Sequence, residues 1–291
     1  MSPPILLIDY NFDWVLRDVY LNPRTHTGFL TLEEVVSVCR ELGAEGLELM
    51  HSYWEDCPAR QLKRLADESG LPLVCYIFHS DLIVPPCSGR EAAERTFRLL
   101  DRTAEMGARL AMIVPGTVKP EVPLAEQRTW LVEGLAACAA HAGAIGITLV
   151  AENIDYPPVQ PLMGRGEDCA AIARRVDSPA FRLIFDTAAP LFVHEAPRQA
   201  LAEMAPYLAH VHLKNARPLE AGEPAGRYLD STRGRRYQGT SLREGIVDLE
   251  PLLAELRLLD YEGCLSIEYQ GEADPREVLR RDIAYVRRLL G

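Results

Sequence analysis

The stretch ITLVAE, residues 147–152, is an apolar run of strand length that ends in an acid. Side chains alternate between the two faces of a β-strand, so an inward-pointing Glu152 shares its face with Thr148 and Val150. The intervening apolar residues then point outward, toward covering helices. The pattern predicts a strand that is buried on both faces and carries a carboxylate at its carboxyl end.

Short apolar runs of this kind recur along the chain and alternate with segments of helical composition. Thr31 and Glu34 have the spacing of a capping box, and Gly43 can end the helix that they begin. The predicted strands lie near residues 5–9, 46–50, 73–78, 109–114, 147–152, 181–186, 209–214 and 264–268. The predicted helices lie near residues 31–43, 91–106, 124–143, 167–176, 249–259 and 275–290.

The alternation of strands and helices favours an α/β fold, because parallel strands need helical crossovers between them. Eight such units in 291 residues fit a (β/α)8 TIM barrel, with residues 1–291 forming one domain. A doubly wound open sheet is the alternative, but no G-x-G-x-x-G motif follows the first predicted strand. The closed barrel is therefore the predicted fold.

The composition argues against several classes of protein. The formal net charge of −11 at pH 7 opposes binding to a phosphate backbone, so no nucleic-acid partner is expected. The N-terminal apolar run is too short to span a membrane, and no basic leader precedes it. Seven cysteines without a C-x-x-C pair indicate reduced thiols. We therefore expect a cytoplasmic protein that does not associate with membranes.

Polar residues occupy the last inward position of four consecutive predicted strands, and these residues are Glu152, Asp186, His212 and Glu268. Active sites of barrel enzymes lie at the carboxyl ends of the strands, so the four side chains can converge there. Three carboxylates without a cation would repel one another. A divalent metal would relieve this repulsion, and the ligand types suit Mn2+, Mg2+, Co2+ or Zn2+. Taken singly, each residue also has a structural explanation, such as a turn cap or a core histidine.

Five motifs carry a resemblance to a known family: GAEGLEL, LVAEN, IFDT, HVHLKN and REGIVDLEPLLAELRLLDYEGCLSIEYQG. They resemble the xylose isomerase-like barrel family of sugar and sugar-phosphate isomerases and epimerases. The resemblance implies that Glu152, Asp186, His212 and Glu268 hold a divalent cation, often Mn2+. It further implies that Glu152 and Glu268 exchange protons with the carbon next to a carbonyl. A metal on the carbonyl and a neighbouring hydroxyl would stabilise the enediolate that this exchange produces.

The predicted function is therefore a metal-dependent isomerase or epimerase of a small sugar or sugar phosphate. Two positions depart from the epimerases of that family, because Ala189 replaces a histidine and Pro158 replaces a second glutamate. These departures keep open a lyase with the same metal site, either a dehydratase or an eliminase of C-glycosides or 3-keto sugars. Endonuclease IV shares the fold but needs more histidine ligands than this chain, with seven histidines, places at the rim. A non-catalytic sugar-binding subunit is the last alternative.

Several residues near the predicted strand ends are candidates for contact with the substrate. Residues 214–243 carry seven basic residues against three acidic ones, which suits an anionic substrate. The same stretch could instead be a solvated loop that pairs with acids of a neighbouring subunit in a homo-oligomer. Aromatic rings in nearby loops can pack on the apolar faces of a sugar. The candidates are Trp14, Glu48, Trp54, His79, Lys214 and Arg217.

Overall fold

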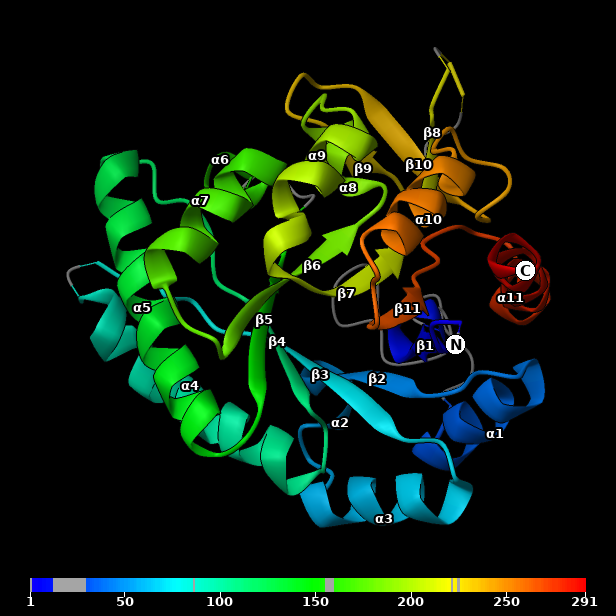
Figure 1. The fold of residues 1–291 in the computed structure, drawn as a ribbon, viewed down its shortest axis with the longest axis horizontal. Helices are drawn as coiled ribbons and strands as arrows, with labels where there is room; N and C mark the ends of the chain where they lie inside the picture. The colour runs from blue at the N-terminus through cyan, green and yellow to red at the C-terminus, as the bar shows by residue number, and fades with distance from the viewer. Residues whose placement is uncertain (1, 13–29, 86, 155–159, 221, 224–225) are drawn as a thin grey trace.

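A closed barrel of parallel strands, surrounded by helices, forms the body of the computed structural model (Figure 1). The structure describes residues 2–12, 30–85, 87–154, 160–220, 222–223 and 226–291. The barrel strands are β1 (Ile5–Ile8), β2 (Leu47–Met50), β3 (Leu73–His79), β4 (Leu110–Val114), β5 (Thr148–Glu152), β6 (Phe181–Asp186), β7 (Leu208–Leu213) and β11 (Cys264–Ile267). The predicted (β/α)8 TIM barrel is confirmed, and each predicted strand corresponds to a barrel strand.

The order of the strands around the barrel is β1-β11-β7-β6-β5-β4-β3-β2, and β2 closes the ring on β1. The register places Asp186 of β6 beside His212 of β7, and His212 beside Ser266 of β11. Residues at matching positions of neighbouring strands point the same way, so they form layers inside the barrel. The carboxyl ends of β5, β6, β7 and β11 therefore share one arc of the rim.

Helices cover the outside of the barrel, and the predicted ones are present with small shifts of their ends. In α1, the Thr31 hydroxyl accepts a hydrogen bond from the backbone N–H of Glu34, and the Glu34 carboxylate accepts one from Thr31, as the capping box predicts. The helices are α1 (Leu32–Leu42), α2 (His51–Trp54), α3 (Ala59–Ser69), α4 (Gly89–Glu105), α5 (Leu124–Ala144), α6 (Gln160–Met163), α7 (Gly166–Val176), α8 (Ala189–Phe192), α9 (Pro197–Met204), α10 (Leu249–Leu258) and α11 (Pro275–Leu290), with 3-10 turns η1 (Asp9–Phe12) and η2 (Ala205–Tyr207).

Sequence analysis missed α3 and α9 among the longer helices. In α3 the buried positions are Ala59, Leu62 and Ala66, which form a narrow stripe of mostly small side chains among charged ones. A stripe this narrow gives a weak periodic signal, because most of the helix faces solvent. The helix ends at Gly70 in the left-handed conformation, with a φ of 67°, which is a stop signal that the sequence did contain.

Residues 214–243, predicted as a basic loop, instead contain a second sheet of three antiparallel strands. Strand β10 (Arg236–Thr240) pairs with β8 (Asn215–Pro218) on one side and with β9 (Leu229–Asp230) on the other. Figure 1 shows the sheet beyond the end of β7, near α8. Phe192 of α8 packs edge-on against Tyr237 of β10, with ring centroids 5.3 Å apart. The segment is therefore folded against the barrel rather than extended over solvent.

The interior of the barrel is filled by strand side chains, most of them apolar. Fully buried polar residues interrupt this core, and they include Glu48 and His210. Buried polar groups of this kind need hydrogen-bond partners, so they mark the layers in which chemistry is arranged. Among the described residues, no helix combines the length and the apolar character that crossing a membrane requires.

Candidate active site

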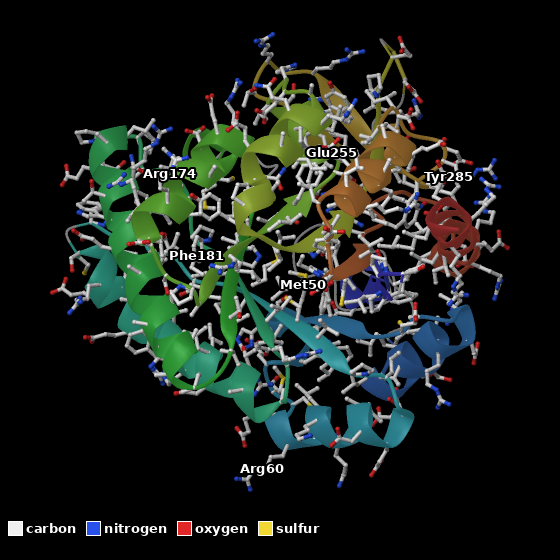
Figure 2. All side chains as sticks on the ribbon, viewed as in Figure 1. Met50, Arg60, Arg174, Phe181, Glu255 and Tyr285 are labelled. Atoms are coloured by element: carbon white, nitrogen blue, oxygen red, sulfur yellow. The ribbon has the colours of Figure 1, made fainter. Side chains whose placement is uncertain are left out.

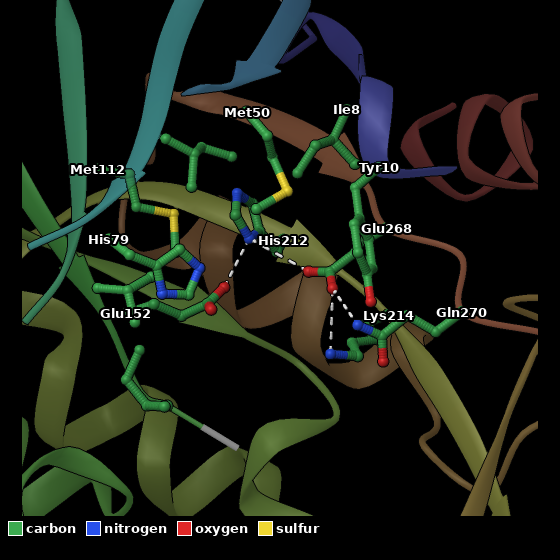
Figure 3. Close-up of a pocket in the computed structure, with 13 residues that line it drawn as sticks. Ile8, Tyr10, Met50, His79, Met112, Glu152, His212, Lys214, Glu268 and Gln270 are labelled. Atoms are coloured by element: carbon green, nitrogen blue, oxygen red, sulfur yellow. Dashed lines mark hydrogen bonds and ion pairs between the residues drawn. The ribbon is translucent and has the colours of Figure 1, made fainter. Parts of the chain in front are cut away.

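A cavity of about 210 Å³ opens at the carboxyl ends of the barrel strands (Figure 3). Most strands, taken together with the residues that directly follow them, contribute two lining residues that are two positions apart, as alternating side chains should be. Strands β1 to β4 contribute mainly apolar side chains, whereas β5, β7 and β11 contribute most of the charged ones. The lining residues are Ile8, Tyr10, Met50, Ile77, His79, Met112, Val114, Glu152, Ile154, His212, Lys214, Glu268 and Gln270. The cavity thus has an apolar arc and a polar arc.

His212 lies between two carboxylates in the polar arc. Its Nδ1 is 2.6 Å from Glu152 Oε1 and 3.5 Å from Glu268 Oε2. Figure 3 shows the two glutamates approaching the imidazole from opposite sides. Glu152 and Glu268 are each 8% exposed and His212 is 1% exposed, so water screens these charges weakly. The structure therefore brings three of the four predicted metal ligands to one place.

Asp186 ends β6 beside this group and is linked to it through Lys214. Its Oδ1 accepts hydrogen bonds from the backbone N–H groups of Ala188 and Ala189, at 2.6 and 3.0 Å. Lys214 Nζ lies 3.3 Å from Asp186 Oδ2 and 3.1 Å from Glu268 Oε1. The buried ammonium therefore stands between two of the predicted ligands, and it keeps their negative charges from facing each other directly.

Asn153, which sequence analysis did not select, holds β6 in position relative to β5. Its Oδ1 accepts from the Asp186 backbone N–H at 2.8 Å, and its Nδ2 donates to the Asp186 carbonyl at 3.1 Å. The pair of bonds ties the ends of β5 and β6 together at the rim. Its position directly after Glu152 in the motif LVAEN was the available signal.

The titration behaviour of the site follows from burial and from the alternation of charges. Burial raises the pKa of Glu152, although its hydrogen bond with His212 opposes the shift. Burial would also raise the pKa of Glu268, but the Lys214 ammonium and His212 outweigh it and hold that pKa below its ordinary value. Burial lowers the pKa of His212, but the Glu48 and Glu152 carboxylates raise it well above the ordinary value. Positive charge is thus strongly favoured at this point of the rim.

Glu152, His212 and Glu268 could hold a metal ion, because one ligand atom from each lies within 4.8 Å of the other two. A proton on His212 Nδ1 that faces both carboxylates takes a position that a cation bound to the same atoms could take instead. Carboxylate oxygens and an imidazole nitrogen are ligands for several divalent metals. The donor set therefore fits a divalent cation and does not by itself select one.

Glu48 was predicted to contact the substrate, but it lies beneath the cavity and is not part of its lining. Its Oε1 is 2.7 Å from His210 Nε2, and its Oε2 is 3.2 Å from His212 Nε2. Met50, two residues further along β2, takes the lining position above it. The predicted contact does not fit this placement, because the Glu48 carboxylate is enclosed inside the barrel with 0% exposure.

The other predicted substrate contacts are placed in different ways. His79 and Lys214 line the cavity. Trp54 donates its indole N–H to Asp9 Oδ2 at 2.6 Å and is not part of the lining, so it holds the start of η1, directly after β1. Trp14 lies outside the described residues. The predicted aromatic wall therefore has one described representative, Tyr10, which sequence analysis had not selected.

Arg217 and Arg227 both lie in residues 214–243, the insertion after β7 that contains the second sheet, but they contact different partners. Arg217 forms an ion pair with Glu223 and donates to Gln238 Oε1 at 2.6 Å, so its guanidinium serves the second sheet. Arg227 donates to the hydroxyl of Tyr10, and its guanidinium carbon lies 5.1 Å from that ring. Because Tyr10 lines the cavity, Arg227 is the basic residue of this pair that reaches the cavity wall.

Gln270 is a further lining residue that sequence analysis missed. Its Nε2 donates to Glu268 Oε1 at 2.8 Å, the same oxygen that faces Lys214. It follows Glu268 by two positions, so the alternation that identified the glutamate would also have placed Gln270 inward. Together, Lys214 and Gln270 hold one oxygen of Glu268 and orient its carboxylate.

The fold and the site define a TIM barrel whose rim carries a carboxylate and histidine group able to hold a metal. The model of the xylose isomerase-like TIM barrel family matches residues 36–289. The chain belongs to this family, and the resemblance of its motifs is confirmed.

Relatives with assigned names include both lyases and epimerases. An inosose dehydratase of Clostridium botulinum is 25% identical over 260 residues, which cover 84% of this chain and 83% of that protein. A 2-epi-5-epi-valiolone 7-phosphate 2-epimerase of Actinoplanes sp. is 28% identical over 192 residues, which cover 63% of this chain and 67% of that protein. A xylose isomerase-like TIM barrel protein of Mycobacterium smegmatis, solved in complex with magnesium, aligns with a TM-score of 0.71 and 19% identity over 99% and 96% of the two chains.

Proposed function

We propose that the chain is a metal-dependent lyase that removes a proton from the carbon next to the carbonyl of a polyhydroxylated ketone and then expels water. The carrying observation is the contact of Lys214 Nζ with Glu268 Oε1, at 3.1 Å inside the cavity. A carboxylate and an ammonium in contact supply a base and an acid to neighbouring atoms of one substrate. The inosose dehydratase, which aligns with 84% of this chain, supports the same class of reaction.

A divalent cation, with Mn2+ as the first choice, would polarise the carbonyl oxygen and make the adjacent C–H more acidic. Glu152, His212 and Glu268 are proposed ligands because their donor atoms lie within 4.8 Å of one another. Asp186 is the fourth, because it shares Lys214 with Glu268. These residues are the ones that sequence analysis selected, and the ligand assignment remains a proposal.

The side chains would carry the proton in three steps. Glu268 takes the proton from carbon and the ketone becomes an enediolate. The electron pair then forms a C=C bond while the neighbouring C–O bond breaks, and Lys214 gives a proton to the departing hydroxyl. The proton on Glu268 passes to Lys214 across their 3.1 Å contact, so both groups return to their starting states. The products are water and an unsaturated ketone.

The division of the cavity supports one orientation of the substrate. The oxygen-bearing edge faces Glu152, Lys214 and Glu268, which can exchange hydrogen bonds with hydroxyls. The C–H face of a ring packs against the apolar arc, which includes Met50 and Met112. Binding sites commonly combine an apolar wall with a few placed polar groups. A cyclic polyhydroxylated ketone fits this division because its ring offers both a C–H face and a polar edge.

Isomerisation or epimerisation is the second candidate, and the two glutamates that flank His212 favour it. If Glu152 returned a proton to the opposite face of the carbon, the product would be an epimer rather than a dehydrated ketone. We place dehydration first because Ala189 takes the position of the histidine expected in epimerases of the family. Ala189 is buried and contributes its backbone N–H to Asp186, so it offers the substrate no hydrogen-bonding side chain.

Incubation of the Mn2+-loaded protein in D2O with a panel of inososes and ketohexoses tests both candidates. We expect deuterium at the carbon next to the carbonyl in the recovered ketone, since proton removal is reversible, and a product that has lost one water, detected by NMR and mass spectrometry. A deuterated epimer with an unchanged formula would move the assignment to the second candidate. The absence of both deuterium exchange and product formation with every ketone of the panel would contradict both.

A further inference from the structure

Glu48, His210 and His212 form a chain of buried hydrogen-bonding groups directly beneath the cavity. Glu48 Oε1 faces His210 Nε2 at 2.7 Å, and Glu48 Oε2 faces His212 Nε2 at 3.2 Å. Glu48 and His210 are 0% exposed, and neither lines the cavity. We propose that Glu48 and His210 are positioning residues that prepare His212 for the metal. This role rests on the proposed metal site, although neither residue would touch the metal or the substrate.

The two ring nitrogens of His212 have different neighbours. This difference indicates which nitrogen would bind the metal and which would carry the proton. Nδ1 faces Glu152 and Glu268 at the cavity, whereas Nε2 faces Glu48 below it. A neutral imidazole that binds a metal through Nδ1 must carry its proton on Nε2. Glu48 Oε2 is placed to accept that proton in a hydrogen bond, which holds the ring in both the required tautomer and the required orientation.

His210 in turn holds Glu48. Its ring stands at 90° to that of His212, with the centroids 5.2 Å apart. The two imidazoles contact different oxygens of the Glu48 carboxylate. Both oxygens are then occupied, and the carboxylate cannot rotate without breaking a buried hydrogen bond. A glutamine at position 48 offers one acceptor oxygen, so it can accept an N–H from one imidazole only and presents an amide N–H to the other.

The same three residues also have donor atoms within 4.8 Å of one another, so a second metal ion is the competing explanation. We favour the positioning role because the Glu48 and His210 side chains are already in hydrogen-bond contact and are enclosed within the barrel. The two explanations predict different stoichiometries. A positioning role leaves one strongly bound ion per chain, whereas a second site requires two.

The test is calorimetric titration of chelator-treated, folded protein with Mn2+, for the wild type, Glu48→Gln, His210→Phe and the double variant. We expect one site in the wild type and a loss of affinity of about 10- to 100-fold in Glu48→Gln, the usual effect of removing such a partner. His210→Phe should lose several-fold less. The double variant should match Glu48→Gln alone, because His210 acts through Glu48 and the effects are then not additive.

Ser266→Ala is the matched control, because Ser266 is equally buried in the same layer, beside His212. It should leave the Mn2+ affinity within about twofold of wild type, a change worth less than about 0.5 kcal/mol. NMR of the imidazole nitrogens in Mg2+-loaded protein gives a second reading, and we expect a protonated Nε2 in the wild type and a loss of this preference in Glu48→Gln. If Glu48→Gln does not fold, His210→Phe carries the same test.

Unchanged affinity in folded Glu48→Gln, equal losses in Ser266→Ala, additive effects in the double variant, or two Mn2+ per chain would each overturn the inference. Wild-type protein that binds no Mn2+ would be a different result. It would overturn the proposed metal site, and the positioning role with it. Failure of the ketone panel while Mn2+ binding behaves as expected would leave the positioning role supported and the reaction wrong.

Discussion

Each end of the barrel has a cavity. The larger cavity lacks the cluster of buried charged side chains that lines the smaller one. The cavity at the amino-terminal end has a volume of about 760 Å³, against about 210 Å³ at the rim. It lies between the start of β1, the end of α10 and the end of α11, and residues such as Pro4, Leu256 and Leu290 line it. Two of its polar side chains bond to the backbone, since Tyr261 donates to the Cys264 carbonyl at 2.7 Å and Arg257 to the carbonyl of Leu289.

The difference teaches that convergence of charged groups, rather than volume, marks the site in this barrel. At the rim, neighbouring strands point their last inward side chains at one space, as Glu152, His212 and Glu268 do. At the other end the strands begin, and helix ends and the N-terminal prolines enclose the space instead. Figure 2 shows polar side chains all around the outside of the molecule, so their presence alone does not mark a site. Barrel enzymes generally place catalysis at the carboxyl ends of strands and stability at the other end.

The largest expected effect is the loss of turnover when a rim glutamate becomes glutamine. Glu152→Gln and Glu268→Gln should each lower kcat by at least about 100-fold, because Glu268 is the proposed base and Glu152 is a proposed metal ligand, and an amide cannot replace a carboxylate in either role. Steady-state kinetics at saturating Mn2+ provides the measurement. The matched control is Glu262→Gln, since Glu262 lines the cavity at the amino-terminal end of the barrel. The kcat of this variant should stay within about twofold of wild type. Equal losses at both ends would remove the distinction between the two cavities.

A smaller effect, but a more specific one, is expected for Lys214→Met. Removal of the ammonium takes away the proposed acid for the departing hydroxyl, while Glu268 keeps its carboxylate. Water loss should fall by about 10- to 100-fold, and deuterium exchange at the carbon should fall less. The ratio of exchange to product, followed by NMR in D2O, measures this separation. Equal loss of both steps, with Mn2+ still bound, would mean that Lys214 acts before proton removal.

Much of the rim could be predicted because alternation along a strand is a local property. The last inward position of a strand identified Glu152, Asp186, His212 and Glu268, and the structure places all four at the same end of the barrel. The same rule, applied strictly to β2, selects Met50 as the last inward residue and puts Glu48 one layer below. Glu48 was assigned to the substrate because its strand placed it near the rim, and its order among the inward positions of that strand was not considered.

Contacts between distant segments could not be predicted in this way. Arg227 meets Tyr10 across 217 positions of sequence, and nothing local to either residue indicates the other. The second sheet was missed because its strands contain Asn, Asp, Pro and Gly, which have low strand propensity. The fold of residues 214–243 determines which arginines face the cavity. The distribution of positive charge over the rim therefore could not be predicted without that fold.

A moderate effect is expected at Asp9, a buried acid of the rim end that lies outside the proposed chemistry. Burial raises its pKa from 3.8 to about 8, against the hydrogen bonds from Trp54 and Met50. Between these values the unfolded chain releases the proton and the folded protein keeps it. Stability from this group is therefore complete below about pH 4 and declines as the pH rises toward 8, by at most about 1.4 kcal/mol per pH unit.

The variant Asp9→Asn tests this dependence, because its amide oxygen can accept from both Trp54 and Met50 at the position of Oδ2. Urea unfolding at pH 5, 6, 7 and 8 should show a wild-type free energy of unfolding that falls relative to that of the variant. A constant difference between the two proteins would mean that Asp9 is ionised in the folded state. The rim would then contain one more buried charge than its geometry suggests.

The smallest expected effect separates two arginines of the insertion and decides whether the rim attracts an anion. Arg217 is held by Glu223 and Gln238 within the second sheet, so Arg217→Gln should change KM by less than about twofold, as surface substitutions usually do. Arg227 contacts Tyr10 at the cavity wall, so Arg227→Gln should raise KM several-fold if the substrate is anionic. It should also flatten the dependence of kcat/KM on salt, because less attraction remains to be screened. With a neutral substrate both variants should resemble wild type, and the positive charge of residues 214–243 then serves the fold of the insertion alone. A larger effect from Arg217 than from Arg227 would contradict the placement of both side chains.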